Sequence, residues 1–198
     1  MKLDRFYPIF DSPEWLERTL PLGVKLVQLR IKDRPEDEVR PMVAQAQALC
    51  RHHGAVLVVN DHWRLAIEHG CDWVHLGQED LDEADLPAIR RAGINVGIST
   101  HDHAELDRAL SLGPDYVALG PVYPTILKQM KWQQQGLARV TEWKRLIGDL
   151  PLVAIGGMSV ARAAGAFQAG ADIVSAVTDI TLNTDPEARV RDWIEVTR

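Results

Sequence analysis

The stretch VNDHWRLAIEHGCDWVHLGQEDL, which runs from Val59 to Leu81, joins two apolar strand-like segments through one helical pattern. The first segment spans Ala55–Val59, and the second spans Trp73–Leu76. Two strands connected through a helix form a βαβ unit, in which the strands are parallel. Because the carboxyl ends of parallel strands meet at one edge, we expect Asp61 and Asp80, which follow the two strands, to lie side by side.

Two neighbouring carboxylates at a strand edge predict a site for a hard cation, and Mg²⁺ is the cation that this ligand set favours. An alternative interpretation is that each aspartate only caps the helix that follows it. Either residue taken alone fits this alternative, and Asp61 fits it well because a helical pattern begins directly after it at His62.

Composition and charge narrow the class of protein. A length of 198 residues, with 46% hydrophobic and 25% charged residues, is typical of one globular domain with a sizeable core. The net charge of −6 argues against a general nucleic-acid binder but leaves a small anionic ligand open. We see no signal peptide and no apolar run long enough to cross a bilayer. Cys50 and Cys71 form no CxxC motif, so we expect two reduced thiols and a cytoplasmic protein.

Strand-like runs alternate with helical patterns along the whole chain. We expect strands at Phe6–Phe10, Val24–Ile31, Ala55–Val59, Trp73–Leu76, Ile94–Ile98, Tyr116–Leu119, Leu152–Ile155 and Ile173–Ala176. We expect helices at Pro13–Leu20, Pro35–His52, His62–His69, Ala84–Ala92, Asp102–Leu112, Ala138–Ile147, Val160–Ala169 and Pro186–Thr197. Eight βα units predict an α/β fold, a (β/α)8 TIM barrel that forms a single compact domain over residues 1–198.

The rival fold is an open, doubly wound sheet. No G-x-G-x-x-G motif follows the first strand, which weakens a dinucleotide-binding version of that fold. Ser99 and Asp102 have the spacing of a capping box, which would place Ser99 at the start of the helix after the fifth strand.

The second strand has side chains that alternate between two faces. The apolar face holds Val27, Leu29 and Ile31, and the polar face holds Gln28, Arg30 and Lys32. In a barrel the apolar face would pack under the helices, and the polar face would line the interior at the mouth. An edge strand exposed to solvent would give the same alternation. Inward cations without an anionic partner would be costly, so the barrel interpretation implies a phosphate-like ligand.

Two further loops are candidates for ligand binding. The connection from Gly120 to Gly136 is longer than the others, and long loops in compact domains are usually lids or binding loops. Lys128 in this loop either folds over the mouth or is an ordinary surface lysine. After the seventh strand, Gly156-Gly157 would let the backbone approach an anion, as loops after strands seven and eight of barrels often do.

Nine sequence elements occur in the order and at the spacing of one known family, and together they cover essentially the whole chain. They are QLRIK (28–32), VND (59–61), VHLGQEDL (74–81), GISTH (97–101), ALGPVYPT (118–125), Lys128, QGL (135–137), VAIGGM (153–158) and VSAV (174–177). By these elements the sequence resembles the thiamine-phosphate synthase (thiamine-phosphate pyrophosphorylase) family.

The resemblance implies a transferase of thiamine biosynthesis. Such an enzyme condenses 4-amino-2-methyl-5-(diphosphomethyl)pyrimidine with 4-methyl-5-(2-phosphoethyl)thiazole on a (β/α)8 barrel, and it releases pyrophosphate. The partners would therefore be two small-molecule substrates, without nucleic acid or membrane, and a homo-oligomer is left open. By the same resemblance, Mg²⁺ would be the cofactor, held by Asp61 and Asp80.

The resemblance also implies roles for residues of this sequence. The segment Gln28, Leu29, Arg30, Ile31 and Lys32, together with Asn60, would hold the pyrimidine substrate and its pyrophosphate, and Ser99 would contact the pyrimidine. The loop residues Thr125, Ile126, Leu127 and Lys128 would line the site. Thr125, Gly157, Val174 and Ser175 would receive the thiazole phosphate. Lys128, Arg30 and Lys32 would be catalytic, with Lys128 stabilising the departing pyrophosphate.

This chemistry agrees with the residue types present. Pyrophosphate leaves carbon readily only when its developing charge is neutralised, which Mg²⁺ and cationic side chains can do. The thiazole nitrogen has a free lone pair, so no general base is needed, and the sequence shows no recognisable nucleophile–base triad. We therefore interpret His75 and His101 as structural or supporting residues rather than as acid–base catalysts.

One position departs from the family pattern. The family has a hydroxyl residue just before the loop lysine, where this chain has Leu127, and residues 129–134 lack the small and proline residues expected there. A lost hydrogen bond to a phosphate costs about 1.5–3 kcal/mol, so our hypothesis is weaker binding of the thiazole phosphate with the reaction intact. An unchanged Michaelis constant for that substrate in Leu127→Thr would contradict it.

Two other functions are open at this stage. One is a thiazole tautomerase-like barrel, which shares the fold without the coupling reaction. The other is a non-catalytic barrel that binds a phosphate metabolite, and Leu127 is the one feature that favours this interpretation. Asp61, Asp80 and Lys128 together favour the synthase over both.

Overall fold

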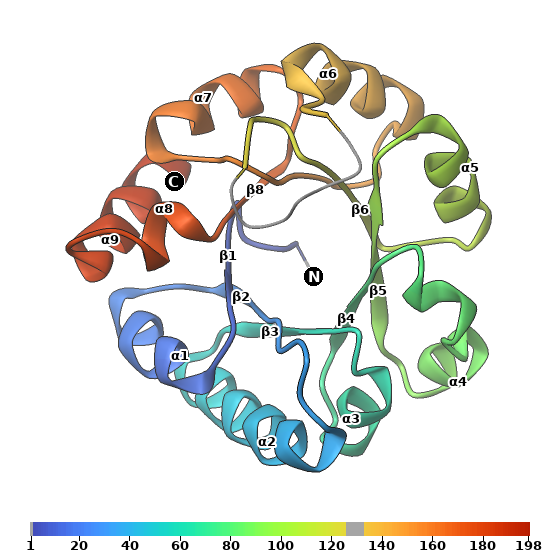
Figure 1. Ribbon diagram of the computed structural model, residues 1–198, viewed down its shortest axis with the longest axis vertical. Helices are drawn as coiled ribbons and strands as arrows, with labels where there is room; N and C mark the ends of the chain where they lie inside the picture. Colours follow the sequence, from blue (N-terminus) through green and yellow to red (C-terminus); the bar gives the residue numbers. More distant parts are fainter. Residues whose placement is uncertain (1, 126–132) are drawn as a thin grey trace.

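The computed structural model describes residues 2–125 and 133–198, which form eight parallel strands closed into a barrel. Each strand is hydrogen-bonded to the next in sequence, and β8 returns to pair with β1 (Figure 1). The strands are β1 (Phe6–Phe10), β2 (Leu26–Leu29), β3 (Val56–Asn60), β4 (Trp73–Leu76), β5 (Asn95–Thr100), β6 (Tyr116–Leu119), β7 (Leu152–Ala154) and β8 (Ile173–Ala176). The predicted barrel is confirmed, and the open doubly wound sheet is wrong.

Helices surround the barrel as an outer ring (Figure 1). They are α1 (Pro13–Thr19), α2 (Glu36–His53), α3 (Trp63–Glu68), α4 (Leu86–Arg91), α5 (His103–Ser111), α6 (Gly136–Ile147), α7 (Val160–Gln168) and α9 (Pro186–Thr197). Shorter turns are η1 (Leu20–Leu22), η2 (Asp80–Asp82) and α8 (Thr178–Thr181). In the described part of the chain, no helix has both the length and the apolarity needed to span a membrane.

Aspartate side chains define where several helices begin. Asp85, Asp102 and Asp185 each accept a hydrogen bond from the backbone N–H three residues later, at 2.8–2.9 Å. Such N-caps satisfy N–H groups that have no partner within the helix. The predicted capping role of Ser99 is wrong, because Ser99 lies inside β5 and Asp102 itself caps α5.

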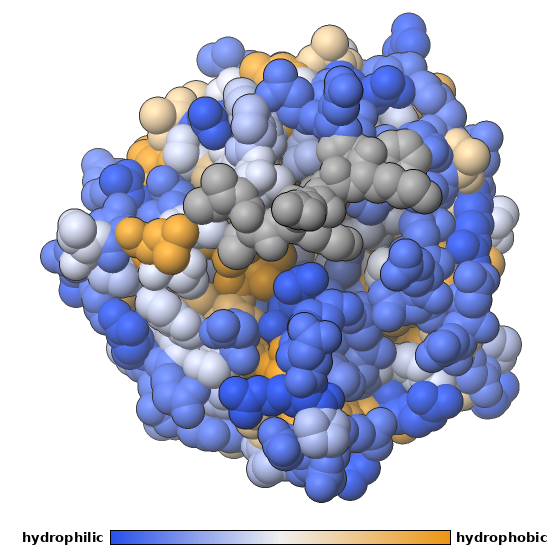
Figure 2. Space-filling model, in the orientation of Figure 1, coloured by the Kyte–Doolittle hydropathy of each residue, from blue (hydrophilic) through white to orange (hydrophobic). Residues whose placement is uncertain are grey.

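The core has two layers, one on each side of the barrel wall. The outer layer lies between strands and helices and contains Val27, Leu29 and Ile31 from the second strand and its end. The inner layer fills the barrel with Tyr7, Leu26, Val58, Trp73, Tyr116, Ala118, Val153 and Ile173. The face of the molecule seen along the barrel is mostly hydrophilic, with a few apolar areas (Figure 2).

Strand β2 is shorter than predicted, and this places its polar residues differently along the barrel axis. Gln28 lies within the strand and is buried, whereas Arg30 and Lys32 lie beyond its carboxyl end and are exposed. The backbone N–H of Arg30 still donates to the carbonyl of Phe10 at 2.7 Å, so the chain stays against β1 for one more residue. The predicted polar face of this segment therefore runs from the barrel interior to its mouth.

Candidate active site

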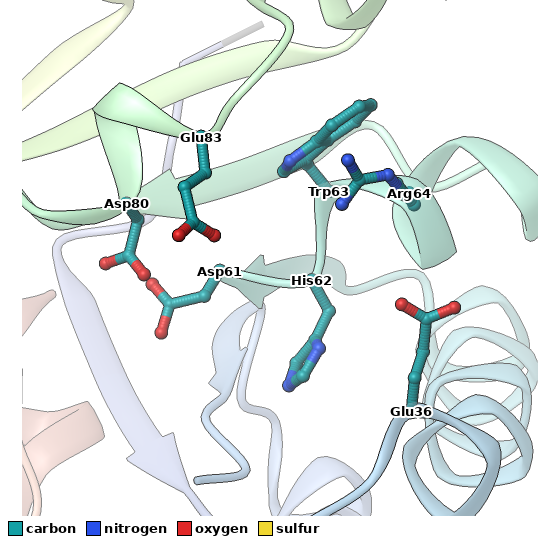
Figure 3. Close-up of a pocket in the computed structure, with 7 residues that line it drawn as sticks. All are labelled: Glu36, Asp61, His62, Trp63, Arg64, Asp80 and Glu83. Carbon is teal, nitrogen blue, oxygen red and sulfur yellow. The ribbon is translucent and has the colours of Figure 1, made fainter.

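Two carboxylates meet where β3 and β4 end. Asp61 follows β3 directly, and Asp80 opens the turn η2 after β4. Figure 3 shows the two side chains pointing toward one another. The pKa of Asp80 is raised, first by burial and then by the negative charge of the Asp61 carboxylate beside it. The structure therefore brings together the two aspartates that the βαβ pattern places at one edge.

Neither aspartate caps the following helix, so that alternative interpretation is wrong. The N-cap of α3 is His62, and the Asp61 carboxylate accepts hydrogen bonds from the Lys32 ammonium group and from Asn60 Nδ2, the latter at 2.6 Å. Asp80 Oδ2 accepts the backbone N–H of Gly77, which precedes it, at 3.2 Å. Both side chains are thus directed to the mouth side of the strand ends.

The backbone at Asp61 leaves the extended conformation of the strand that precedes it. Its φ of 60° lies in the left-handed region, which few residues other than glycine adopt. Its N–H donates to the carbonyl of His75 on β4 at 2.9 Å, which extends the β3–β4 ladder by one residue. A strained backbone at a strand end is a common feature of binding sites.

A cleft of about 190 Å³ opens beside the aspartate pair. It is lined by Glu36, Asp61, His62, Trp63, Arg64, Asp80 and Glu83, and Figure 3 shows the Glu83 carboxylate directed toward the pair. Among residues 2–125 and 133–198, no group of three His, Cys, Asp or Glu side chains converges as a metal site. A cation here would have two protein carboxylates and would take its other ligands from water or substrate, as Mg²⁺ commonly does.

The charges of the pair fit such a cation. Two carboxylates in contact repel one another, and this repulsion adds to the larger effect of burial in raising the pKa of Asp80. A divalent cation bound there would offset the repulsion between the two carboxylates. Lys32 supplies only part of the compensation, because its side chain is 42% exposed.

Positive charge approaches the same mouth from the end of β2. The pKa of His75 is lowered to about 4, first by burial and next by the charges of Arg30 and Lys32. These two cations therefore act on an imidazole inside the barrel, and they lie on the mouth side of it. With Asp61 and Asp80, they give the mouth adjacent anionic and cationic groups.

Beneath the mouth, a chain of hydrogen bonds crosses the barrel interior. Gln28 Nε2 donates to the Tyr7 hydroxyl at 2.8 Å, and the hydroxyls of Tyr7 and Tyr116 are 3.0 Å apart. The Tyr116 hydroxyl lies 2.8 Å from His75 Nδ1, and His75 Nε2 lies 2.8 Å from Ser99 Oγ. We call these five residues the interior chain. Its two ends, Gln28 and Ser99, are residues for which the family resemblance predicts contact with the pyrimidine substrate.

Tyr7 and Tyr116 belong to the interior chain, although no motif in the sequence indicates them. Both are inward-facing positions of their strands, in the same layer as other inner-core residues. The signal was available in the strand alternation, which places Tyr116 on the same face as Ala118 of β6. The interpretation of His75 as a supporting residue agrees with its buried position in this chain.

Other predicted substrate residues are placed less favourably. The side chains of Leu29 and Ile31 pack in the outer core, so only their backbone could face a ligand. Val174 also packs there, and its N–H donates to the Arg5 carbonyl at 2.9 Å. Val174 therefore offers neither its side chain nor its N–H to the mouth.

The predicted thiazole-phosphate side is described only in part. Ser175 faces the interior opposite Tyr7, and its buried Oγ has no hydrogen-bond partner among the described residues. Gly157 has a φ of 62°, and an added Cβ would lie 2.3 Å from the Pro124 carbonyl oxygen, so this glycine admits the loop after β6. Thr125 is half-buried in that loop, and Ile126, Leu127 and Lys128 lie outside the described residues.

These features define a class of protein: a (β/α)8 barrel with charged side chains gathered at the carboxyl ends of its strands, where enzymes of this fold have their active sites. A family model described as thiamine monophosphate synthase matches residues 6–180. The chain belongs to the thiamine monophosphate synthase family, and the resemblance seen in its sequence is confirmed.

Relatives and a solved structure agree with this assignment. A Rhizobium etli protein named thiamine-phosphate synthase is 59% identical over 197 residues, which are 100% of this chain and 97% of that protein. A Citrobacter koseri protein of the same name is 47% identical over 191 residues, 96% of this chain and 87% of that one. The thiamine phosphate pyrophosphorylase structure from Pyrococcus furiosus superposes with a TM-score of 0.86 at 24% identity, covering 98% of this chain and 95% of that one, and so shares the fold.

Proposed function

We propose that this protein is a thiamine-phosphate synthase, which joins the aminopyrimidine methyl pyrophosphate to the thiazole phosphate and releases pyrophosphate. The observation that carries the proposal is the contact between Asp61 and Asp80 next to Lys32 and Arg30 at the barrel mouth. The names of relatives that are 47–59% identical over nearly the whole chain support the same reaction.

In the proposed reaction, the bond between the pyrimidine methylene and the pyrophosphate oxygen breaks, and its electron pair leaves on pyrophosphate. The thiazole nitrogen forms the new C–N bond with its lone pair. Arg30 and Lys32 bind the pyrophosphate and stabilise the charge that develops on it. Asp61 and Asp80 would hold Mg²⁺, which when bound supplies further neutralisation of that charge.

The remaining residues bind and orient the substrates. Gln28, Asn60 and Ser99 contact the pyrimidine substrate, while Thr125, Gly157 and Ser175 receive the thiazole phosphate. Lys128, which lies outside the described residues, completes the pyrophosphate site in this proposal. Phosphate anchors on opposite sides of the mouth would align the two reacting atoms, a proximity effect of up to about 7 kcal/mol. We assign Val174 to packing alone because of its place in the outer core.

The test is pyrophosphate release from the two substrates, measured with and without Mg²⁺. Asp80→Asn should lower Mg²⁺-dependent turnover about 100-fold or more, because it removes one of two carboxylate ligands. Asp82→Asn is the matched control, since Asp82 lies in the same short turn but is 73% exposed and pairs with Arg108. Its turnover should equal that of the wild type.

Each result separates the candidate functions. Substrate binding without turnover in the wild type would identify a binding protein, and conversion of the thiazole alone would identify a tautomerase. Full activity of Asp80→Asn would remove Asp80 from the metal site while leaving the synthase assignment in place.

We also propose that the protein acts in the cytoplasm. The support is chemical: Cys50 and Cys71 are buried free thiols, and burial raises the pKa of each to about 12. Unpaired cysteines of this kind are typical of proteins in reducing compartments.

A further inference from the structure

The interior chain has a direction of hydrogen-bond donation that starts at Gln28. The amide nitrogen of Gln28 can only donate, so the Tyr7 oxygen accepts from it. The single hydroxyl hydrogen of Tyr7 is then available for the Tyr116 oxygen. Tyr116 has accepted one hydrogen bond, and it donates its own hydrogen to His75 Nδ1.

This direction fixes the tautomer of His75. A neutral imidazole has one nitrogen that accepts and one that carries hydrogen. Because Nδ1 accepts from Tyr116, Nε2 carries the hydrogen and donates it to Ser99 Oγ. Burial agrees with this assignment, because it lowers the pKa of His75 and raises that of Tyr7 and Tyr116. The hydroxyl hydrogen of Ser99 therefore remains available for a partner other than His75.

A glycine on the strand between Tyr116 and His75 leaves room for these two side chains to meet. The two residues lie on β6 and β4, and in the strand register both are paired with Gly97 of the intervening β5. A Cβ on Gly97 would lie 1.9 Å from Tyr116 Cζ, so the phenol ring occupies the space above a residue without a side chain. Tyr116 also stacks on Trp73, with ring centroids 5.8 Å apart. The position of the Tyr116 ring is therefore set by the space that Gly97 leaves and by the stacking on Trp73.

We infer that Tyr7, Tyr116 and His75 are positioning residues that fix the Ser99 hydroxyl as a hydrogen-bond donor toward the pyrimidine substrate. The site then selects a pyrimidine whose ring nitrogen accepts at that place. A 4-aminopyrimidine has such a nitrogen, whereas in the 4-oxo counterpart the nitrogen beside the carbonyl carries a hydrogen. This inference rests on the proposed function, which brings the pyrimidine against Ser99.

The central experiment uses Tyr116→Phe, which keeps the ring and its stacking but removes the donor to His75. We expect kcat/KM for the aminopyrimidine pyrophosphate to fall about ten-fold, the loss typical of one neutral hydrogen bond. The KM for the thiazole phosphate should not change. The preference for the amino substrate over its 4-oxo analogue should shrink by a similar factor.

A double-mutant cycle with Ser99→Ala separates positioning from a general structural effect. If Tyr116 acts through Ser99, then Tyr116→Phe causes no further loss of kcat/KM in the Ser99→Ala background. Fully additive losses would overturn the inference. Thr100→Val is the matched control, because Thr100 follows Ser99 on β5 but bonds Ala118 and Trp143 in the outer layer. It should leave the substrate preference unchanged.

A second readout does not depend on activity. The ¹⁵N NMR signals of His75 should show the proton on Nε2 in the wild type, and a proton on Nδ1 would overturn the inference. Tyr7→Phe provides a second variant if Tyr116→Phe does not fold, because it removes the hydroxyl that links Gln28 to Tyr116. It should lower the share of His75 that carries its proton on Nε2, and an unchanged share would remove Tyr7 from the positioning residues. A wild type that releases no pyrophosphate would overturn the proposed function and the substrate role together, whereas additivity in an active wild type would overturn the inference alone.

Discussion

Acidification should destabilise the fold through His75, whose imidazole is held uncharged inside the barrel. Its pKa is lowered from 6.5 to about 4 by burial, with a smaller effect from Arg30 and Lys32. The unfolded chain takes up a proton near pH 6.5 and the folded chain only near pH 4, so the unfolded state binds more protons between these values. The contribution of His75 to stability is therefore complete above pH 6.5 and is lost as the pH falls to 4.

The size of this effect follows from the two pKa values. The difference between 6.5 and about 4 corresponds to about 3 kcal/mol of unfolding free energy. This is a large fraction of the roughly 5–15 kcal/mol that stabilises a typical domain. The measurement is urea unfolding of the wild type and of His75→Gln, followed by tryptophan fluorescence, at a series of pH values from 7 to 4.

The comparison depends on slopes, because His75→Gln also removes hydrogen bonds and lowers stability at every pH. Between pH 7 and 4, the wild type should lose about 3 kcal/mol more than His75→Gln does. His52→Gln provides the control, since His52 is exposed to solvent near the end of α2 and no ion pair is lost with it among the described residues. This variant should follow the wild-type slope. Parallel curves for the wild type and His75→Gln would refute the reasoning.

Three further predictions concern packing, a buried hydroxyl and the metal. Gly97→Ala should cost at least about 3 kcal/mol in a denaturation experiment, because its Cβ would overlap the Tyr116 ring, and Tyr116→Ala in the same chain should reduce that cost. Thr100→Val should cost about 1–3 kcal/mol by the same measurement, since Trp143 Nε1 loses its acceptor at 2.9 Å; an unchanged midpoint would contradict this. Chelation should abolish pyrophosphate release, and added Mg²⁺ should restore it if Asp61 and Asp80 hold the ion.

Most strands and helices follow from the alternation of apolar runs and helical patterns, because each element buries one face. Strand β2 ends earlier than its pattern predicts because Leu29 is the last of its residues in register with both neighbouring strands, β1 and β3. The turn α8 has four residues, too few to show a helical period. Ser99 matched a capping motif by spacing alone, but its inward position on β5 decides its partners.

In the site, too, some residues can be placed from local sequence patterns and others only from contacts between distant parts of the chain. The rule that parallel strands end at one edge was enough to bring Asp61 and Asp80 together. The interior chain depends on contacts between residues far apart in sequence, such as Tyr7 and Tyr116, which are separated by 109 positions. No local pattern states that Gly97 leaves room for a tyrosine from the next strand. That fact requires coordinates.

The pairing of β8 with β1 has a consequence for any shortened form of the chain. Phe6, Tyr7 and Pro8 lie beside Val174, Ser175 and Ala176, and the other side of β1 lies against β2. Deleting the first ten residues would thus bare the backbone of two strands at once. Exposed strand edges recruit other chains, so such a truncation should aggregate rather than merely lose activity.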